Sequence, residues 1–315
     1  MRILVTGASG FAGSHLIDLL VRQSPGIIFA STRSQVKGDD SKVWWLQCDL
    51  RKSSSVDEVV NLAKPDVIYH LAAYPSPQKS FKYPIRALNE TAGMHINLME
   101  ACLKAGMAPL VLLSGSGQVY GRPDKLPIDE QAKIDCPTPY AVAKFSQETI
   151  AGYYQNRGIR TIIARAFNHT GPRQSTDFLV ANLAYQVVRA EASAGQIKEI
   201  KVGDLSSKRD FTDVRDVVKA YAKLVAKGQL GEVYNVCSGR SVSGQEILEK
   251  LISQAGVKIV VKFDKSKARP SDNAELRGDH SKLTSATNWM PTIALDKTLE
   301  DTLNYWRRVV GGQRA

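Results

Sequence analysis

The feature of this sequence that most constrains its fold is a glycine-rich turn near the start of the chain. Residues 6–13 have the sequence TGASGFAG, between a short β-rich run at 2–6 and an amphipathic helical pattern at 11–22. Three glycines at this spacing allow a tight turn, a close approach of the backbone to a pyrophosphate and close helix–strand packing, and the helix N-terminus then faces the phosphate charge. The turn therefore predicts a dinucleotide-binding site. Its expected contact residues are Gly7, Ser9, Gly10, Phe11, Ala12 and Gly13.

The first two thirds of the chain alternate β-rich runs with helical patterns, which predicts βαβ units that build a parallel sheet. We expect an α/β fold, with a Rossmann-type doubly wound parallel sheet in residues 1–167 and a smaller α/β carboxyl-terminal substrate lobe in 168–315. Parts of 205–240 are expected to return to the first domain. After 11–22, the expected strands are 26–31, 43–48, 66–71, 109–114 and 161–166, and the expected helices are 55–63, 87–105 and 140–157.

Beyond residue 168 the regular alternation weakens. A Gly/Pro/Asp-rich stretch at 115–139 is too long for a simple connection, and long loops in such positions usually carry function. In the second half the expected helices are 178–191, 214–227, 244–255 and 295–308, and the expected strands are 198–202 and 232–237.

The end of the second predicted strand indicates which dinucleotide binds. An NAD-binding turn usually has a carboxylate about 20 residues after the glycines, which bonds the ribose 2′-hydroxyl. Here residues 29–34 have the sequence FASTRS, and the first acidic residue after this strand is Asp39. The Arg33 guanidinium and the hydroxyls beside it suit a 2′-phosphate, so the sequence favours NADP(H) and leaves NAD(H) open. The alternative role for Arg33 is a solvated surface charge.

Two further segments are expected along the coenzyme. Asp49 and Leu50 follow the third strand, where the carboxylate is able to accept a hydrogen bond from the adenine amino group. Leu71, Ala72 and Ala73 end the fourth strand, where small residues let the coenzyme pass. A turn aspartate and a tight packing site are the alternative interpretations of these two segments.

A phenol, an ammonium and a hydroxyl form the candidate catalytic set. Tyr140 and Lys144 are four residues apart at the start of a helix, so they project from one face. Thr138 is suited to cap that helix, and Pro139 suits its first turn. A cation near a phenol lowers the pKa of the phenol from about 10 towards neutrality, which makes it a usable proton donor or acceptor. Ser116, near the preceding strand, is able to bond the same reacting oxygen.

These motifs resemble the extended short-chain dehydrogenase/reductase family across nearly the whole chain. The resemblance rests on the glycine turn, on 70–73, on 116–121 and on the Tyr140–Lys144 pair. It implies that Tyr140 is the general acid/base, that Lys144 tunes it and orients the nicotinamide ribose, and that Ser116 steadies the substrate oxygen.

The carboxyl-terminal half resembles a narrower group, the GDP-mannose 4,6-dehydratases and GDP-4-keto-6-deoxymannose reductases. This resemblance implies that Asn168, Arg209 and Arg269 hold the diphosphate of a GDP-sugar. Charge-assisted, often bidentate bonds between arginine and phosphate give a physical reason for that role. An ordinary surface or structural ion pair is the alternative for each arginine. The segments concerned are 167–175, 209–216, 231–239 and 269–272.

Gln118 helps to choose among the reactions of this group. The resemblance implies that a dehydratase would have an acid, usually Glu, two residues after its catalytic Ser or Thr. Gln118 occupies that position, and an amide has no accessible basic pKa, so it cannot remove a proton. The reaction that remains is the reduction by NADPH of the C4 keto group of GDP-4-keto-6-deoxy-D-mannose. The product would be GDP-D-rhamnose or its C4 epimer GDP-6-deoxytalose.

Other functions stay open at this point. A C4 epimerase would use the same three residues with a tightly bound NAD(H), and a 4,6-dehydratase would need another acid. A non-catalytic NADP-binding sensor on the same fold is disfavoured, because such proteins commonly lose the Tyr or the Lys. The resemblance also implies a homodimer or homotetramer that pairs through 87–105 and 140–157.

The overall composition excludes several other classes of protein. A net charge of +11 invites a nucleic-acid interpretation, but the basic residues are dispersed rather than clustered. Four cysteines and five histidines show no metal-ligand spacing. No apolar run approaches the 18 or so residues of a membrane span. The β-rich run begins at residue 2 with no leader before it, so we expect a cytoplasmic enzyme with no membrane or nucleic-acid partner.

Overall fold

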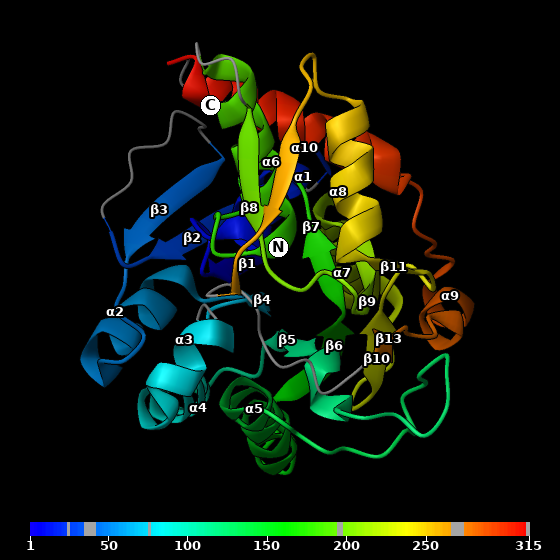
Figure 1. Cartoon of the computed structure of the whole chain (residues 1–315). Helices are drawn as coiled ribbons and strands as arrows, with labels where there is room; N and C mark the ends of the chain where they lie inside the picture. The colour runs from blue at the N-terminus through cyan, green and yellow to red at the C-terminus, as the bar shows by residue number, and fades with distance from the viewer. Residues whose placement is uncertain (24–25, 35–41, 75–76, 194–197, 266–273, 313–315) are drawn as a thin grey trace.

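A computed structural model describes residues 1–23, 26–34, 42–74, 77–193, 198–265 and 274–312. Within these residues a seven-stranded sheet forms the centre of the protein, and all its neighbouring strands are parallel (Figure 1). The chain starts in the middle of this sheet and extends outwards in both directions. From one edge of the sheet to the other, the strands are β10 (Val233–Val236), β6 (Arg160–Ala166), β5 (Leu110–Ser116), β4 (Val67–His70), β1 (Arg2–Thr6), β2 (Ile27–Thr32) and β3 (Val43–Gln47).

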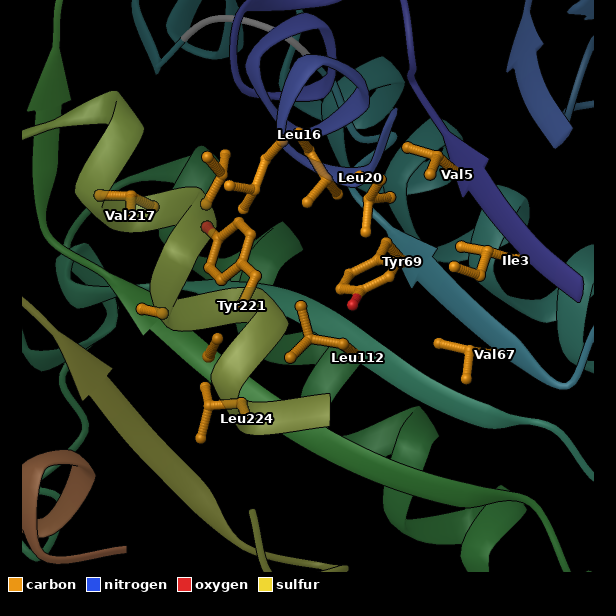
Figure 2. Close-up of a cluster of buried hydrophobic side chains, with 14 of the residues drawn as sticks. Ile3, Val5, Leu16, Leu20, Val67, Tyr69, Leu112, Val217, Tyr221 and Leu224 are labelled. Carbon is orange, nitrogen blue, oxygen red and sulfur yellow. The ribbon is translucent and has the colours of Figure 1, made fainter. Parts of the chain in front are cut away.

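Helices cover both faces of this sheet. On one face Leu16 and Leu20 of α1 and Tyr221 of α7 pack on Tyr69 and Leu112 of the sheet (Figure 2). Strands buried on both faces need apolar side chains in both directions, which accounts for their nearly continuous apolar sequence. The first face carries α1 (Phe11–Gln23) and α7 (Val214–Lys227), and the second carries α2 (Ser53–Ala63), α4 (Pro84–Lys104) and α5 (Pro139–Gln155).

The carboxyl-terminal lobe contains two small sheets and its own apolar core. In one sheet a central strand pairs with three short strands that are distant in sequence, and in the other two strands pair in parallel. The first consists of β9 (Lys208–Asp213) with β7 (Asn168–Thr170), β11 (Ser241–Ser243) and β13 (Glu275–Leu276), and the second of β8 (Glu199–Val202) and β12 (Val260–Phe263). The helices that bury the core are α6 (Leu179–Ala192), α8 (Gly244–Ser253) and α10 (Leu295–Val310).

The Asp216 carboxylate is one of the groups that tie this lobe to a helix of the large sheet. Asp216 lies in the first turn of α7, and its carboxylate accepts hydrogen bonds from the backbone N–H groups of Thr292 and Ile293, both at 2.7 Å. The buried Trp289 donates its indole N–H to the Asp216 carbonyl at 3.0 Å. The segment that leads into α10 is therefore fixed to a helix of the first core.

The predicted doubly wound α/β fold is confirmed, and the expected elements shift at their ends by no more than three residues. Strand β5 continues through Ser116 into a short 3₁₀ helix, η1 (Gly117–Tyr120), so the loop expected at 115–139 begins only at 121. Both α7 and β10 return to the large sheet, whereas a domain boundary at residue 168 stays a prediction. No helix among the described residues is long and apolar enough to cross a membrane.

Several short elements have no counterpart among the sequence predictions. The short strands among them pair residues that are far apart in the chain, such as Asn168 with Phe211. A segment of two to seven residues carries too little hydrophobic periodicity of its own to be recognised, and its structure comes from its partner. These elements are α3 (Pro77–Lys82), β7, β9, β11, β12, β13 and α9 (Ser281–Thr287).

Candidate active site

A cavity of about 740 Å³ opens at the carboxyl ends of the central strands of the large sheet. One side is formed by the turn after β1, the ends of β2, β4 and β5, and the start of α5. The other side is formed by the segments after β6 and before α6, together with β9. Doubly wound sheets bind ligands at this edge. The cavity therefore lies where the sequence predicts a dinucleotide, and both lobes line it.

The glycine-rich turn has the close packing that its sequence implies. Gly7 has a φ of 69°, and a Cβ there would lie 3.1 Å from the backbone nitrogen of Ala72. A Cβ on Gly13 would lie 2.2 Å from the Gly7 carbonyl oxygen, so only glycine allows α1 to start so close to the turn. Gly13 contributes this packing and is not part of the cavity wall. The turn residues that do line the wall are Gly7, Ser9, Gly10, Phe11 and Ala12.

The ends of β2 and β3 bring Arg33 and Leu50 to the cavity and leave Asp49 outside its wall. The exposed Arg33 follows Thr32, whose hydroxyl is 2.7 Å from that of Ser9. The Asp49 carboxylate instead accepts two bonds from the Arg51 guanidinium, both at 2.8 Å, and this partner lowers the pKa of Asp49 to about 2. The structure thus gives Asp49 a partner other than an adenine amino group.

The residues after β4 follow the turn closely. Leu71, Ala72 and Ala73 all line the cavity, as the sequence predicts for a surface along which a coenzyme passes. The Ala72 N–H donates to the Thr6 hydroxyl at 3.3 Å, which joins this segment to the end of β1. Ala72 and Ala73 have small side chains that occupy little of the space in front of this segment.

Ser116, Tyr140 and Lys144 all line this same cavity. Thr138 caps α5 by accepting a bond from the Ala141 N–H at 3.1 Å, so the helix starts with Tyr140 in its first turn. Tyr140 is half-buried and shares a hydrogen bond with Ser116 at the end of β5. The three predicted residues are therefore brought together beside the glycine-rich turn.

The pKa of the phenol shifts in the direction opposite to the one expected from the sequence. Burial raises the pKa of Tyr140 to about 12, although the bond with Ser116 acts the other way. Burial also lowers the pKa of Lys144 to about 8, against the opposing charge of Glu148. The expectation of a lowered phenol pKa is wrong here, because the Lys144 ammonium donates to Gln147 Oε1 at 2.9 Å and burial dominates at the phenol.

A buried ion pair holds the middle of α5 against the sheet. The Arg165 guanidinium on β6 donates to the Glu148 carboxylate on α5, with the closest approach at 2.7 Å, and both side chains are buried. A second N–H of Arg165 donates to the Tyr120 hydroxyl at 2.9 Å. A Cβ on Gly115 would lie 2.9 Å from the Glu148 carboxylate. Glycine at this position, immediately before Ser116, therefore leaves room for the ion pair.

Two of the three residues expected to hold a diphosphate, Asn168 and Arg209, line the opposite side of the cavity. Asn168 is on β7 and Arg209 on the adjacent β9, where partial burial lowers the pKa of the guanidinium. The third, Arg269, lies outside the described residues. No group of three or more potential metal-ligating side chains occurs in the described ranges.

Other residues of the wall are not assigned a role by the sequence, although Arg173 and Phe211 lie in segments that carry the resemblance. Arg173 has a φ of 72°, and its guanidinium donates to His15 at 2.9 Å and to Asp18. Gln78 on α3 donates to the Asp177 carbonyl at 3.2 Å, which links the two sides of the cavity. Their shared position depends on tertiary structure alone. The wall residues of this kind are Gln78, Arg173, Asp177, Phe178 and Phe211.

Comparison with known proteins agrees with this geometry. Residues 4–302 match the family described as GDP-mannose 4,6 dehydratase. The chain is 32% identical over 309 residues to GDP-6-deoxy-D-mannose reductase of Pseudomonas aeruginosa, covering 97% of each chain. It is 28% identical over 315 residues to a UDP-glucose 4-epimerase of Mycolicibacterium smegmatis, covering 98% of this chain and 99% of that one.

Two solved structures extend the likeness. The structure of RMD from Pseudomonas aeruginosa complexed with NADPH has a TM-score of 0.86 at 31% identity, covering 98% of this chain and 100% of that one. The UDP-glucose 4-epimerase of Thermotoga maritima with UDP-glucose has a TM-score of 0.88 at 25% identity and the same coverage. The chain belongs to the GDP-mannose 4,6-dehydratase family of enzymes, within the extended short-chain dehydrogenases/reductases.

Proposed function

We propose that this enzyme uses NADPH to reduce the C4 keto group of GDP-4-keto-6-deoxy-D-mannose. The observation that carries the proposal is one cavity that combines a glycine-rich phosphate turn, the Ser116–Tyr140–Lys144 set, and an amide rather than an acid at Gln118. The product is GDP-D-rhamnose, or GDP-6-deoxytalose if hydride arrives on the other face of C4. The 32% identity to GDP-6-deoxy-D-mannose reductase supports this substrate class.

The protonation states of the catalytic side chains suit a reduction. NADPH, when bound, supplies the hydride that C4 receives. Tyr140 donates its proton to the C4 oxygen, and its pKa of about 12 keeps the phenol protonated at neutral pH. Ser116 holds the same oxygen through its hydroxyl. Lys144, with a pKa of about 8, is an ammonium at neutral pH and contributes positive charge beside the reacting groups.

The residues at the end of β2 support NADP(H) as the coenzyme, with NAD(H) as the alternative. Arg33 lines the cavity just after the end of β2, next to the Thr32 hydroxyl, and these two residues would hold the 2′-phosphate of NADP(H). A carboxylate at this position would repel a 2′-phosphate, and β2 ends without one. The likeness to RMD complexed with NADPH agrees with this choice, whereas epimerase relatives have been solved with NAD.

A 4,6-dehydratase reaction is disfavoured although the family is described by that activity. Gln118 is half-buried in the cavity wall two residues beyond Ser116, and the Ser116 hydroxyl accepts a bond from its backbone N–H at 3.2 Å. The amide of Gln118 cannot remove a proton from a sugar carbon. A Cβ on Gly117 would lie 2.8 Å from the Phe167 ring, so the intervening position has no room for an acidic side chain.

A nucleotide-sugar 4-epimerase is the second candidate function. It is favoured by the epimerase relatives, among them the Thermotoga maritima enzyme with UDP-glucose at 25% identity. An epimerase oxidises and then reduces the same carbon, so it regenerates its coenzyme in every turnover. It would convert substrate without consuming added coenzyme, which separates it from a reductase.

The substrate diphosphate is proposed to bind Asn168, Arg209 and Arg269, by the charge-assisted bonds that arginine forms with phosphate. A homodimer or homotetramer is proposed to pair through α4 and α5. These two helices pack together and expose Ile85, Ile96, Val142 and Tyr153 to solvent, and apolar side chains gathered on packed helices suit an interface. The cysteines of the described residues are free thiols, which fits the cytoplasmic location expected from the sequence.

The decisive experiment mixes the purified enzyme with NADPH and GDP-4-keto-6-deoxy-D-mannose. We expect stoichiometric loss of NADPH absorbance, and NMR of the product then assigns the configuration at C4. The Tyr140→Phe variant is the control for a reaction in this site. Turnover of a nucleotide sugar without consumption of coenzyme would instead establish the epimerase, and formation of a 4-keto sugar from GDP-mannose would establish a dehydratase.

A further inference from the structure

We propose that Gln147 is the positioning residue that holds the Lys144 ammonium in place and connects it, through His70 and Thr6, to the glycine-rich turn. The proposal rests on the proposed function in one respect, that Lys144 acts in the coenzyme site. Gln147 is completely buried on α5, three residues after Lys144. It lies behind the cavity wall rather than in it.

The orientation of the Gln147 amide follows from the chemistry of its partners. The Lys144 ammonium is only a donor, so the amide atom 2.9 Å from Nζ is the oxygen Oε1. The Thr91 carbonyl is only an acceptor, and the Gln147 Nε2 donates to it at 3.2 Å. Lys144 is thereby held by a side chain that is itself fixed to the backbone of α4.

The same amide determines which nitrogen of His70 carries the proton. A second N–H of Gln147 faces His70 Nε2 at 3.5 Å, and two N–H groups cannot bond each other, so Nε2 is the acceptor. The proton is then on Nδ1, which donates to the Thr6 hydroxyl at 2.8 Å. Thr6 also accepts from the Ala72 N–H at 3.3 Å and directly precedes Gly7. The series of hydrogen bonds therefore runs from Lys144 through Gln147 and His70 to Thr6, at the start of the glycine-rich turn, and on to Ala72, which packs against Gly7.

The surroundings of His70 keep its ring neutral, so the series of hydrogen bonds stays in one protonation state. Burial holds the pKa of His70 well below its usual value, and the neighbouring His95 and Lys144 act in the same direction. His95 stacks on His70 with ring centroids 5.2 Å apart, and burial lowers its own pKa to about 3. The negative charge of Glu148 raises the pKa of Lys144, against the larger effect of burial. A neutral acceptor such as Gln147 orients the ammonium without cancelling the charge that it presents to the cavity.

Two substitutions at one position separate orientation from packing. Gln147→Met keeps the volume and removes the acceptor, so we expect the Kd for NADPH to rise about tenfold and the pKa of Lys144 to fall further. Gln147→Glu restores an acceptor and adds a charge. It also lacks the N–H groups that donate to Thr91 and His70, so we expect its Kd to lie between those of the wild type and Gln147→Met, and the pKa of Lys144 to rise by about 1 unit or more. Fluorescence titration with NADPH and side-chain ¹⁵N NMR of Lys144 give the two readouts.

The matched control is Ser146→Ala on the same helix, because the Ser146 hydroxyl donates only to the Ala143 carbonyl at 2.8 Å among the described contacts. Its affinity and its Lys144 pKa should equal those of the wild type. A residue with a packing role alone would tolerate Met better than a buried Glu and would leave Lys144 unmoved. That pattern, or an unchanged Kd in Gln147→Met, would overturn the proposal.

The wild-type enzyme supplies a test that needs no variant to fold. We expect ¹⁵N NMR of the histidine rings to show His70 as the Nδ1–H tautomer from about pH 6 to about pH 9. An Nε2–H tautomer, or a protonated ring in that range, would overturn the proposal. These readouts require only the enzyme and NADPH, so a failure to reduce GDP-4-keto-6-deoxy-D-mannose would overturn the proposed function and leave this inference intact.

Discussion

The two sides of the cavity are built in different ways. On the proposed coenzyme side, the wall consists of backbone and small side chains at the ends of adjacent strands, and the sheet register sets Thr6 beside both Ser31 and His70. On the proposed substrate side, the wall consists of larger side chains on short strands, with Asn168 paired to Phe211 and Arg209 to Val242. The first arrangement depends on sheet topology, and the second on individual residues.

This difference explains how relatives with different named substrates share one fold. RMD complexed with NADPH and a UDP-glucose 4-epimerase are both similar in structure to this chain, with TM-scores of 0.86 and 0.88, and the named relatives include a GDP-6-deoxy-D-mannose reductase. We infer that a coenzyme surface made of backbone survives much sequence change, whereas the substrate is selected by a few side chains. Substitutions that affect one side and leave the other unchanged test this separation.

The largest effect is expected where the two sides meet, at Tyr140. Tyr140→Phe removes the proton donor, so we expect kcat to fall about 10³-fold while the Kd for NADPH changes less than about twofold. Steady-state kinetics and coenzyme titration measure the two values. The control is Tyr305→Phe on α10, outside the cavity wall. A variant Tyr140→Phe that retained a tenth of the wild-type rate would show that another group donates the proton.

On the substrate side, Arg209→Met should raise KM for the GDP-sugar about 10- to 100-fold. The reason is the loss of charge-assisted bonds to phosphate, which the remaining wall cannot replace. Coenzyme affinity should stay unchanged. Arg240→Met removes a positive charge from an exposed position outside the cavity wall and serves as the control. A parallel loss of NADPH affinity in Arg209→Met would mean that the two sides are not separate.

On the coenzyme side, Arg33→Asp should shift the preference for NADPH over NADH by about tenfold, because a carboxylate repels a 2′-phosphate and suits a 2′-hydroxyl. The ratio of kcat/KM values for the two coenzymes measures this shift. KM for the sugar substrate should not move. An unchanged ratio would remove Arg33 from coenzyme recognition.

The smallest effect is expected at Asp49. Its carboxylate pairs with Arg51 at a partly exposed site, and exposed pairs contribute at most about 1 kcal/mol. Asp49→Ala should therefore change the Kd for NADPH less than about threefold. A change of tenfold or more would show instead that Asp49 bonds the adenine amino group, as its position after the third strand suggests.

The sequence predicts the coenzyme side far better than the substrate side, for physical reasons. The turn at 6–13 and the Tyr140–Lys144 pair are local patterns, and local geometry is enough to place them on one edge of a parallel sheet. The pKa of Tyr140 is set by burial that many separate segments create, so the predicted direction is wrong. Gln78 and Phe178 reach the wall only through tertiary packing, and no residue spacing in the sequence predicts that they line the cavity.

The hydrogen bonds around Asp216 determine how the enzyme responds to loss of its carboxyl-terminal segment. The segment from Trp289 to Ile293 is closed onto α7, which itself packs on α1 behind the coenzyme turn. A cut before Trp289 would withdraw an indole from the first core, and two N–H donors and one hydroxyl donor from one carboxylate. Truncation near the carboxyl terminus should therefore destabilise the core formed by the amino-terminal strands and helices. The two ends of the chain should unfold in a single thermal transition.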